Sequence, residues 1–307
     1  MKLKPINNSL EKVSLEQIEN HKKISISELR RDLSNLKKFP ATSNENCFFG
    51  NPFLYHFQFQ NLLKCKRQDG QTIYDIHQDS EKWNELLENT RKRNRGGRTA
   101  AGNIYECFRI NSGSVVMFKS TTAKYLYRKY GAKSVLDPTA GWGGRMLGAW
   151  SLGIDYVGID TNIEMKPAYS QMMDFLFDYD AEHRNVFFQE SRLEMIWKSC
   201  LEVDFTQIPY DFVLTSPPYV NLELYEHMEK WESNTAFHKN FLIPLWDKCM
   251  SGIKQGGFVC LNISPRMYED ALSLGLSKCD EEENLKQQLG QQTGKKKQDK
   301  IYIWRKS

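Results

Sequence analysis

The residues best suited to chemistry form the tetrapeptide Ser216-Pro217-Pro218-Tyr219, which directly follows a short apolar run at 211–215. Two consecutive prolines remove two backbone donors and fix two φ angles, so the strand predicted over 211–215 cannot continue through them. We therefore expect a rigid, extended turn at the carboxyl end of a strand, which is where ligands bind in open α/β sheets.

This turn offers hydrogen-bond acceptors beside a flat ring. The Ser216 hydroxyl and the carbonyl oxygens of Ser216 and Pro217 can accept from an exocyclic amine, and Tyr219 can stack on the ring that carries the amine. Acceptors around an amino group draw out its protons and localise its lone pair for attack. The alternative is a proline-rich strand exit with no chemical role, and a second motif upstream argues against it.

The second motif, Asp137-Pro-Thr-Ala-Gly-Trp-Gly-Gly144, lies between an apolar run and a helical pattern. Gly141 and Gly143 allow the backbone to approach a ligand closely, and the helix N-terminus adds a positive dipole. The next predicted strand, 156–160, ends in Asp160, about twenty residues beyond the turn. From that position a carboxylate can accept both hydroxyls of a ribose, although a strand-end acid can also simply cap a helix.

Strands and helices alternate through the last two thirds of the chain. Further strands are predicted over 185–190, which ends in the acid Glu190, and over 211–215, 256–263 and 301–304. Helical patterns lie between them, including 237–250. This alternation predicts an α/β fold with a mostly parallel sheet and helices on both faces.

The first 114 residues have a different character. Ser25-Ile-Ser-Glu28 predicts a capping box that opens a helix with Leu29, Leu33 and Leu36 on one face. The aromatic alternation at 53–59 favours a core strand over a base-stacking surface. A further helix, capped by Asp79-Ser80, is predicted to run into a basic segment.

That basic segment, 91–98, has two interpretations that both stay open. It contains five cations and two glycines in eight residues, including Arg91, Arg93, Arg95 and Arg98. Cations at a helix end are favoured by the helix dipole, which accounts for the first part of the run. Contacts to phosphates would account for all of it, and would make these four arginines nucleic-acid ligands.

The composition limits the classes of protein to which this chain can belong. The chain has 307 residues, 40% of them hydrophobic, and a formal net charge of only +4. Its seven cysteines are scattered without a Cys-x-x-Cys pair, so we expect a reducing compartment with neither a disulfide framework nor a zinc site. The sequence has no run of membrane-spanning length and no signal-peptide core, so we expect a cytoplasmic protein.

Residues 115–307 resemble the S-adenosylmethionine-dependent amino-methyltransferases of DNA, which make N4-methylcytosine or N6-methyladenine. Asp137-Pro-Thr-Ala-Gly-Trp-Gly-Gly144 is similar to the family's Asp-Pro-Phe-x-Gly-x-Gly cofactor loop, and Ser216-Pro-Pro-Tyr219 to its catalytic loop. Phe118-Lys119 resembles the element that these enzymes place against the methionine moiety. Thr139, Trp142 and Gly144 depart from the family pattern, in which an aromatic, a small residue and a Thr are usual.

The resemblance implies a Rossmann-like class I methyltransferase domain over 115–307 with S-adenosyl-L-methionine as cofactor and double-stranded DNA as partner. The target base would be flipped out of the duplex to stack on Tyr219, with Pro217 and Pro218 completing the catalytic loop. The implied cofactor contacts are Asp160 for the ribose, Glu190 for the adenine, and, around the methionine, Phe118, Asp137, Pro138, Thr139, Gly141 and Gly143.

Target recognition falls to the remaining chain. Only about seventy residues separate the two motifs, so residues 1–114 are expected to recognise DNA, helped by the segment 221–225 after the catalytic loop. Ser216 before Pro-Pro favours N4 of cytosine over N6 of adenine within this family. RNA or protein-glutamine methylation, and a non-catalytic nucleic-acid-binding protein, remain alternatives. Nicotinamide dehydrogenases do not need Ser-Pro-Pro-Tyr, and carbon-5 cytosine methylation needs a Pro-Cys pair that the chain lacks.

Overall fold

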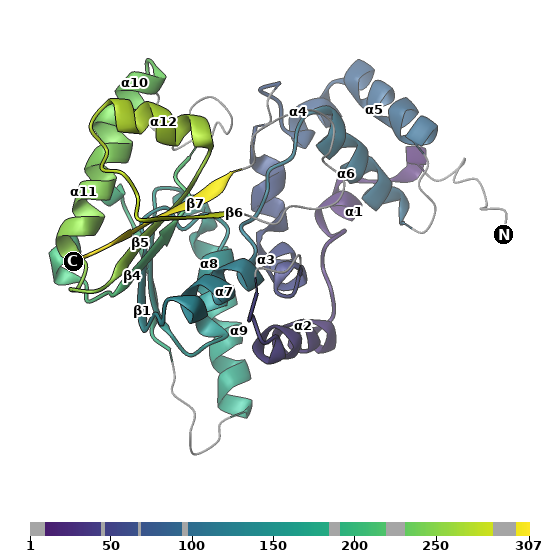
Figure 1. Cartoon of the computed structure of the whole chain (residues 1–307). Helices are drawn as coiled ribbons and strands as arrows, with labels where there is room; N and C mark the ends of the chain where they lie inside the picture. Colours follow the sequence, from purple (N-terminus) through teal and green to yellow (C-terminus); the bar gives the residue numbers. More distant parts are fainter. Residues whose placement is uncertain are drawn as a thin grey trace.

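A seven-stranded sheet forms the centre of the computed structural model, which describes residues 10–43, 47–66, 69–93, 98–183, 191–218, 231–284 and 299–307. The strand order is β3-β2-β1-β4-β5-β7-β6 (Figure 1). The strands are β1 Ser134–Asp137, β2 Asp155–Asp160, β3 Leu193–Trp197, β4 Phe212–Thr215, β5 Phe258–Ile263, β6 Glu281–Asn284 and β7 Lys300–Arg305. β1 to β5 pair in parallel, whereas β7 is antiparallel to both of its neighbours.

This strand order is that of a Rossmann-like class I methyltransferase sheet, and it confirms the predicted α/β fold. β1 has β2 on one side and β4 on the other, so the order of the strands reverses between β1 and β4. In open α/β sheets, a crevice for ligands opens at the carboxyl ends of the strands on either side of such a reversal. The fold therefore brings together the two turns that the sequence singles out, one after β1 and one after β4.

Helices cover both faces of the sheet, as expected. α7 (Ser120–Lys129), α8 (Gly144–Trp150) and α9 (Lys166–Glu182) lie on one face, and α10 (Asn234–Phe237), α11 (Ile243–Gly252) and α12 (Pro265–Ser273) on the other (Figure 1). Side chains alternate between the two cores along each strand. On β7, Ile301 and Ile303 belong to one core, while Tyr302 and Trp304 belong to the other.

The N-terminal part of the chain is helical. It begins with a short helical turn at Leu10–Lys12 and comprises the helices α1 Leu15–Glu19, α2 Ile26–Lys38, α3 Asn51–Lys64, α4 Ile73–Gln78, α5 Ser80–Arg93 and α6 Ala100–Asn111. Further short helical turns lie in the rest of the chain, at Ile163–Met165, Cys200–Glu202, Phe205–Gln207 and His238–Leu242. The predicted capping box of α2 is present, because Ser25 N donates to Glu28 Oε2 (2.9 Å) and Glu28 N to Ser25 Oγ (3.3 Å). Among the described residues, no helix is long and apolar enough to cross a bilayer.

The prediction of a strand over 53–59 is wrong, since this segment lies within helix α3. Gly50, at φ 91°, turns the chain into the helix, and the Asp32 carboxylate accepts hydrogen bonds from Gly50 N and Phe53 N, both at 3.1 Å. The aromatic rings pack in two directions: Phe53 contacts Phe175 of α9, and Phe59 contacts Tyr105 of α6. A helix buried on two sides shows no single apolar face, and Phe53 and Phe59 are too buried to stack on bases.

Two strands differ from expectation. The strand that pairs with β2 is β3, Leu193–Trp197, whereas the strand predicted over 185–190 lies outside the described residues. β6 was not predicted at all, because its sequence Glu-Glu-Glu-Asn has no apolar residue. It is stabilised by charge instead: Lys300 of β7 pairs with Glu282, and Lys129 of α7 with Glu283, both at 2.7 Å.

α2 and α3 share one hydrophobic core with the helices of the sheet. Lys124 of α7 is buried and donates to the last carbonyls of α2, those of Leu36 (2.7 Å) and Lys37 (2.9 Å). Lys37 in turn pairs with Asp180 of α9 at 2.6 Å. Beyond α3, helices α1, α4, α5 and α6 form what we call the N-terminal lobe, which lies on the far side of α3 from the sheet (Figure 1).

Candidate active site

The glycine turn after β1 is tightly packed at Gly143 and Gly144 and less crowded at Gly141. Gly141 and Gly143 both have positive φ, at 56° and 87°. A Cβ at Gly143 would come within 2.7 Å of Met172 Cε, and one at Gly144 would collide with the carbonyl oxygen of Phe118. At Gly141 the nearest atom to an added Cβ would be 3.9 Å away, so this part of the turn leaves room for a ligand.

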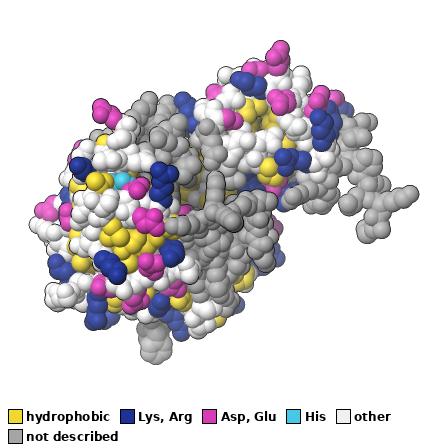
Figure 2. Space-filling view, turned by 45° about the horizontal axis from the view of Figure 1, so that its top comes forward, with side chains coloured by type: hydrophobic (Ala, Val, Ile, Leu, Met, Phe, Trp, Pro, Cys, Tyr) yellow, Lys and Arg dark blue, Asp and Glu magenta, His cyan; other side chains and the backbone are white. Residues whose placement is uncertain are grey.

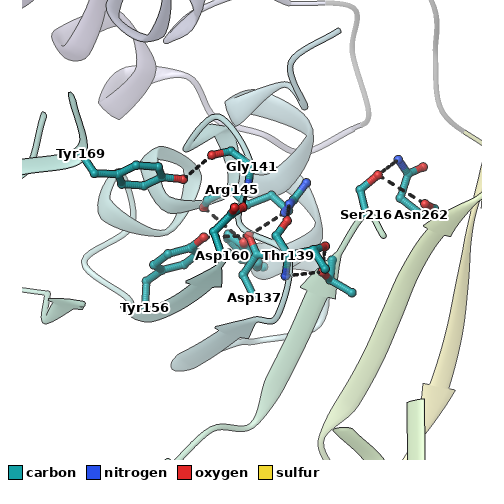
Figure 3. Close-up of polar contacts among 11 residues, drawn as sticks. Asp137, Thr139, Gly141, Arg145, Tyr156, Asp160, Tyr169, Ser216 and Asn262 are labelled. Carbon is teal, nitrogen blue, oxygen red and sulfur yellow. Dashed lines mark hydrogen bonds and ion pairs between the residues drawn. The ribbon is translucent and has the colours of Figure 1, made fainter. Parts of the chain in front are cut away.

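Asp160 fixes the same turn from the end of β2. Its carboxylate accepts hydrogen bonds from Gly141 N (2.8 Å) and Asn162 N (2.9 Å), and Tyr169 donates to the Gly141 carbonyl at 2.8 Å (Figure 3). Burial raises the pKa of Asp160 to about 6, and the two backbone N–H groups oppose that rise. The side chain is only partly buried, so its free lone pairs can accept hydroxyl groups, as the sequence predicts for a ribose.

Asp137, at the end of β1, is fully buried and occupied by protein partners. Its Oδ2 accepts from Arg145 Nε and from the Tyr156 hydroxyl, both at 2.7 Å. Arg145 also donates to the Thr139 carbonyl, and its guanidinium lies 5.3 Å from the centroid of the Phe118 ring. Asp137 therefore holds the turn in shape through Arg145, and Phe118 packs against the turn, with its carbonyl oxygen close to Gly144.

The departures from the family pattern have structural partners. The Thr139 backbone N donates to Thr215 Oγ1 (3.1 Å), and the two threonine hydroxyls are 2.6 Å apart, which ties the cofactor turn to the end of β4. Trp142 is 7% exposed and belongs to the hydrophobic core, so its bulk points away from the open side of the turn. Pro138 is buried beneath the turn.

Ser216 follows β4 and meets Asn262 of β5 (Figure 3). Asn262 Nδ2 donates to Ser216 Oγ at 3.0 Å, and Ser216 Oγ lies 3.4 Å from the Asn262 carbonyl oxygen. Asn262 is 8% exposed, and its buried Oδ1 has no hydrogen-bond partner among the described residues. Ser216 is partly exposed and keeps a lone pair for a further donor, while Pro217 is buried and Pro218 partly buried.

Sequence reasoning did not single out Asn262 or give Arg145 a role. Asn262 is a polar residue near the end of an otherwise apolar strand, and that was the available signal. Its partner depends on the register of β4 with β5, in which Thr215 pairs with Leu261. Tyr219, Glu190 and the segment 221–225 lie outside the described residues.

The basic segment does not act as one unit in the part that the structure describes. Arg91 pairs with Glu11 at 2.6 Å, and Arg93 donates to Asn111 Oδ1 at 3.2 Å. Arg98 pairs with Glu106 of α6 at 3.3 Å, and Arg95 lies outside the described residues. Within the described ranges, no group of three or more His, Cys, Asp or Glu side chains could hold a metal ion.

The sequence matches no protein-family model and no curated protein. The chain is similar in structure to a Listeria monocytogenes protein assigned to the class I S-adenosylmethionine-dependent methyltransferases (14% identity, 92% of this chain and 88% of that one, TM-score 0.43). It is also similar to an rRNA methylase from Streptococcus thermophilus (13% identity, 63% of this chain and 99% of that one, TM-score 0.39). A third similar structure is an RNA methyltransferase from Salinibacter ruber in complex with S-adenosyl-L-homocysteine (13% identity, 62% of this chain and 94% of that one, TM-score 0.38).

Proposed function

We propose that the protein is an S-adenosylmethionine-dependent methyltransferase that methylates the exocyclic amine of a base in double-stranded DNA. The main support is that the turns after β1 and after β4 are joined to each other where the strand order reverses. The glycine turn with Asp160 lies on one side, Ser216 on the other, and Thr139 and Thr215 join them. An acceptor for an amine and a nucleoside-binding turn are thus held on one rigid edge of the sheet.

The residues present suit the cofactor. Asp160 is a partly exposed residue whose carboxylate can accept from a ribose, and an added Cβ at Gly141 would meet no atom closer than 3.9 Å, so nothing crowds the turn there. Arg145 supports the turn through the Thr139 carbonyl and lies 5.3 Å from the centroid of the Phe118 ring, and Phe118 remains a candidate contact of the methionine moiety. When bound, S-adenosylmethionine supplies an electrophilic methyl group.

The protein's part in the reaction is positioning and electrostatics. Ser216 Oγ, already accepting from Asn262, takes a second hydrogen bond from the substrate amine, and the Pro217 carbonyl takes another. Tyr219 stacks on the base. With its protons drawn toward these oxygens, the amine nitrogen would have its lone pair free to attack the methyl group; the new N–C bond would replace the methyl–sulfur bond, S-adenosylhomocysteine would leave, and the amine proton would be released to water.

Within this proposal, N4 of cytosine is the favoured target, because Ser stands before Pro-Pro. N6 of adenine remains open, since one loop can serve two amines of similar shape and acidity. RNA is the second candidate substrate, because several of the structurally similar proteins are RNA methyltransferases. Enzymes of the resembled type that act on RNA or protein glutamine more often carry Asn or Asp before Pro-Pro, which favours DNA.

The test is methyl transfer from labelled cofactor to duplex DNA, to RNA and to protein, followed by digestion and nucleoside analysis. We expect N4-methylcytosine from duplex DNA, and loss of transfer in Ser216→Ala. The matched control is Ser251→Ala, which removes an exposed hydroxyl from α11. Label found only in N6-methyladenine would overturn the cytosine assignment, and label found only in RNA would overturn DNA as substrate. No transfer to any substrate would leave the non-catalytic binding protein.

A further inference from the structure

Glu106 of α6 organises a group of cations on the N-terminal lobe. Arg109 forms two hydrogen bonds with it, Nη2 to Oε1 at 2.9 Å and Nε to Oε2 at 3.2 Å. Arg98 reaches the same carboxylate, with Nη1 3.3 Å from Oε2. One carboxylate thus holds two guanidinium groups in fixed positions, and both remain open to solvent, with side chains 42% (Arg98) and 33% (Arg109) exposed.

Lys22, in the connection between α1 and α2, adds a third cation. Its Nζ lies 5.3 Å from the centroid of the Tyr55 ring and 6.0 Å from that of Tyr105, the neighbour of Glu106. Lys22 forms no ion pair with the residues that the structure describes. Burial and the charge of Arg98 lower the pKa of Lys22, with Glu106 opposing them and Arg109 adding to them. We call Lys22, Arg98, Arg109 and Glu106 the Lys22 cluster.

The Lys22 cluster has an excess of two positive charges. His21 beside it does not add to the charge, because burial and the charges of Lys22 and Arg98 lower its pKa to about 4. Partly desolvated like charges repel each other, so an anion that bridges them would be favoured. Guanidinium groups match the geometry of phosphate oxygens, and an ammonium adds a point charge.

The other arginines of the basic segment are differently placed. Arg91 pairs one to one with Glu11, and Arg93 binds the side-chain carbonyl of Asn111. Neither shares a carboxylate with a second cation among the described residues. The Lys22 cluster differs because one carboxylate holds two of its guanidinium groups. Figure 2 shows lysine and arginine side chains on the N-terminal lobe, interspersed with acidic and hydrophobic ones.

We propose that Lys22, Arg98 and Arg109 bind a backbone phosphate of the nucleic-acid substrate. This inference rests on the proposed function, and it assigns the N-terminal lobe a place in substrate binding. The Glu106 carboxylate preorganises the two arginines, so little side-chain entropy is lost when the phosphate binds. A phosphate contact positions the duplex without reading its sequence.

The test is binding of a fluorescently labelled duplex DNA and a duplex RNA, followed by anisotropy between about 50 and 200 mM salt. We expect Lys22→Gln and Arg109→Gln each to weaken binding on the order of fivefold and to reduce the slope of log affinity against log salt by about 1. Lys22→Arg keeps the charge and should keep the affinity. The matched control is Lys254→Gln, which removes the same charge from an exposed side chain between α11 and β5, outside the N-terminal lobe and the basic segment.

Equal affinities and salt slopes for Lys22→Gln and Lys254→Gln would overturn the phosphate site, as would a wild-type protein that binds neither duplex. Thermal unfolding of each variant separates lost binding from lost folding, and Lys22→Arg provides a second check. The two proposals fail separately. Salt-dependent binding that needs Lys22, without methyl transfer, would contradict only the proposed function. Methyl transfer that is indifferent to Lys22 would contradict only the phosphate site.

Discussion

Arg145 Nε donates to Asp137 Oδ2 at 2.7 Å, and this ion pair is buried, with side chains 4% and 0% exposed. Asp137 ends β1 and Arg145 lies in the first turn of α8, so the pair closes the glycine turn between them. The same guanidinium holds the Thr139 carbonyl, and the Tyr156 hydroxyl donates to the same Oδ2, while the buried Oδ1 of Asp137 has no hydrogen-bond partner among the described residues. The shape of the turn therefore depends on a charge pair beneath it.

Asp137→Asn should destabilise the protein strongly, because it leaves the Arg145 charge buried without a counterion. Loss of one partner of a buried pair typically costs about 3–5 kcal/mol. Urea denaturation measures the free energy of unfolding. The control is Arg266→Gln, which breaks an exposed pair on α12 (3.8 Å, arginine 83% exposed) and should change stability by less than about 0.5 kcal/mol. Equal effects of the two substitutions would show that the buried pair is not structurally important.

Cofactor affinity should fall as pH is lowered through about 6. Burial raises the pKa of Asp160 from its ordinary 3.8 to about 6, and only the ionised carboxylate offers all of its lone pairs to ribose hydroxyls. Calorimetry with S-adenosylhomocysteine at pH 8, 6 and 5 measures the effect. Asp160→Asn should bind weakly at every pH and lose this dependence. An Asp160→Asn protein that binds as tightly as wild type would remove Asp160 from the cofactor site.

The raised pKa of Asp160 has the opposite effect on folding, because it stabilises the native state as pH falls. Between about 6 and 3.8 the native state holds a proton on Asp160 that the unfolded state has released. Asp160 therefore favours the native state increasingly as pH falls through this window. In Asp160→Asn without ligand, this contribution to the pH dependence of unfolding should disappear.

Asn262 acts on the reaction through Ser216, so the two residues should be coupled. Asn262→Ala removes the donor that orients the Ser216 hydroxyl, and it should lower methyl transfer by about tenfold or more while leaving S-adenosylhomocysteine binding unchanged. Once Ser216 is alanine, Asn262 has no hydroxyl to orient. The double variant should therefore be no slower than Ser216→Ala alone. Additive losses, or weaker binding of S-adenosylhomocysteine, would indicate a general structural role instead.

Features of the fold that depend on local sequence were predicted, and those that depend on contacts between distant residues were not. The strands β1, β2, β4, β5 and β7 and the glycine turn were predictable, because apolar runs and turn residues are local signals. The partners of the site were not, since Ser216 meets Asn262 only through strand pairing. α3 was read as a strand because its aromatic residues pack on both the sheet's helices and the N-terminal lobe.

Gly144 and Gly131 are required for different reasons: Gly144 has no space for a Cβ, and Gly131 has a positive φ. A Cβ at Gly144 would collide with the backbone carbonyl of Phe118, which cannot rotate away as a side chain could. Gly131, at φ 67°, has nothing within 4 Å of an added Cβ, so alanine there meets only the backbone strain. Gly131→Ala should cost about 1–2 kcal/mol of stability and leave S-adenosylhomocysteine binding unchanged.

Gly144→Ala should cost more, about 3 kcal/mol, and should also weaken cofactor binding, because the turn must move away from Phe118. Denaturation and calorimetry on both variants give the comparison. If Gly144→Ala bound the cofactor normally and lost no more stability than Gly131→Ala, the close contact between Phe118 and the turn would not shape the site.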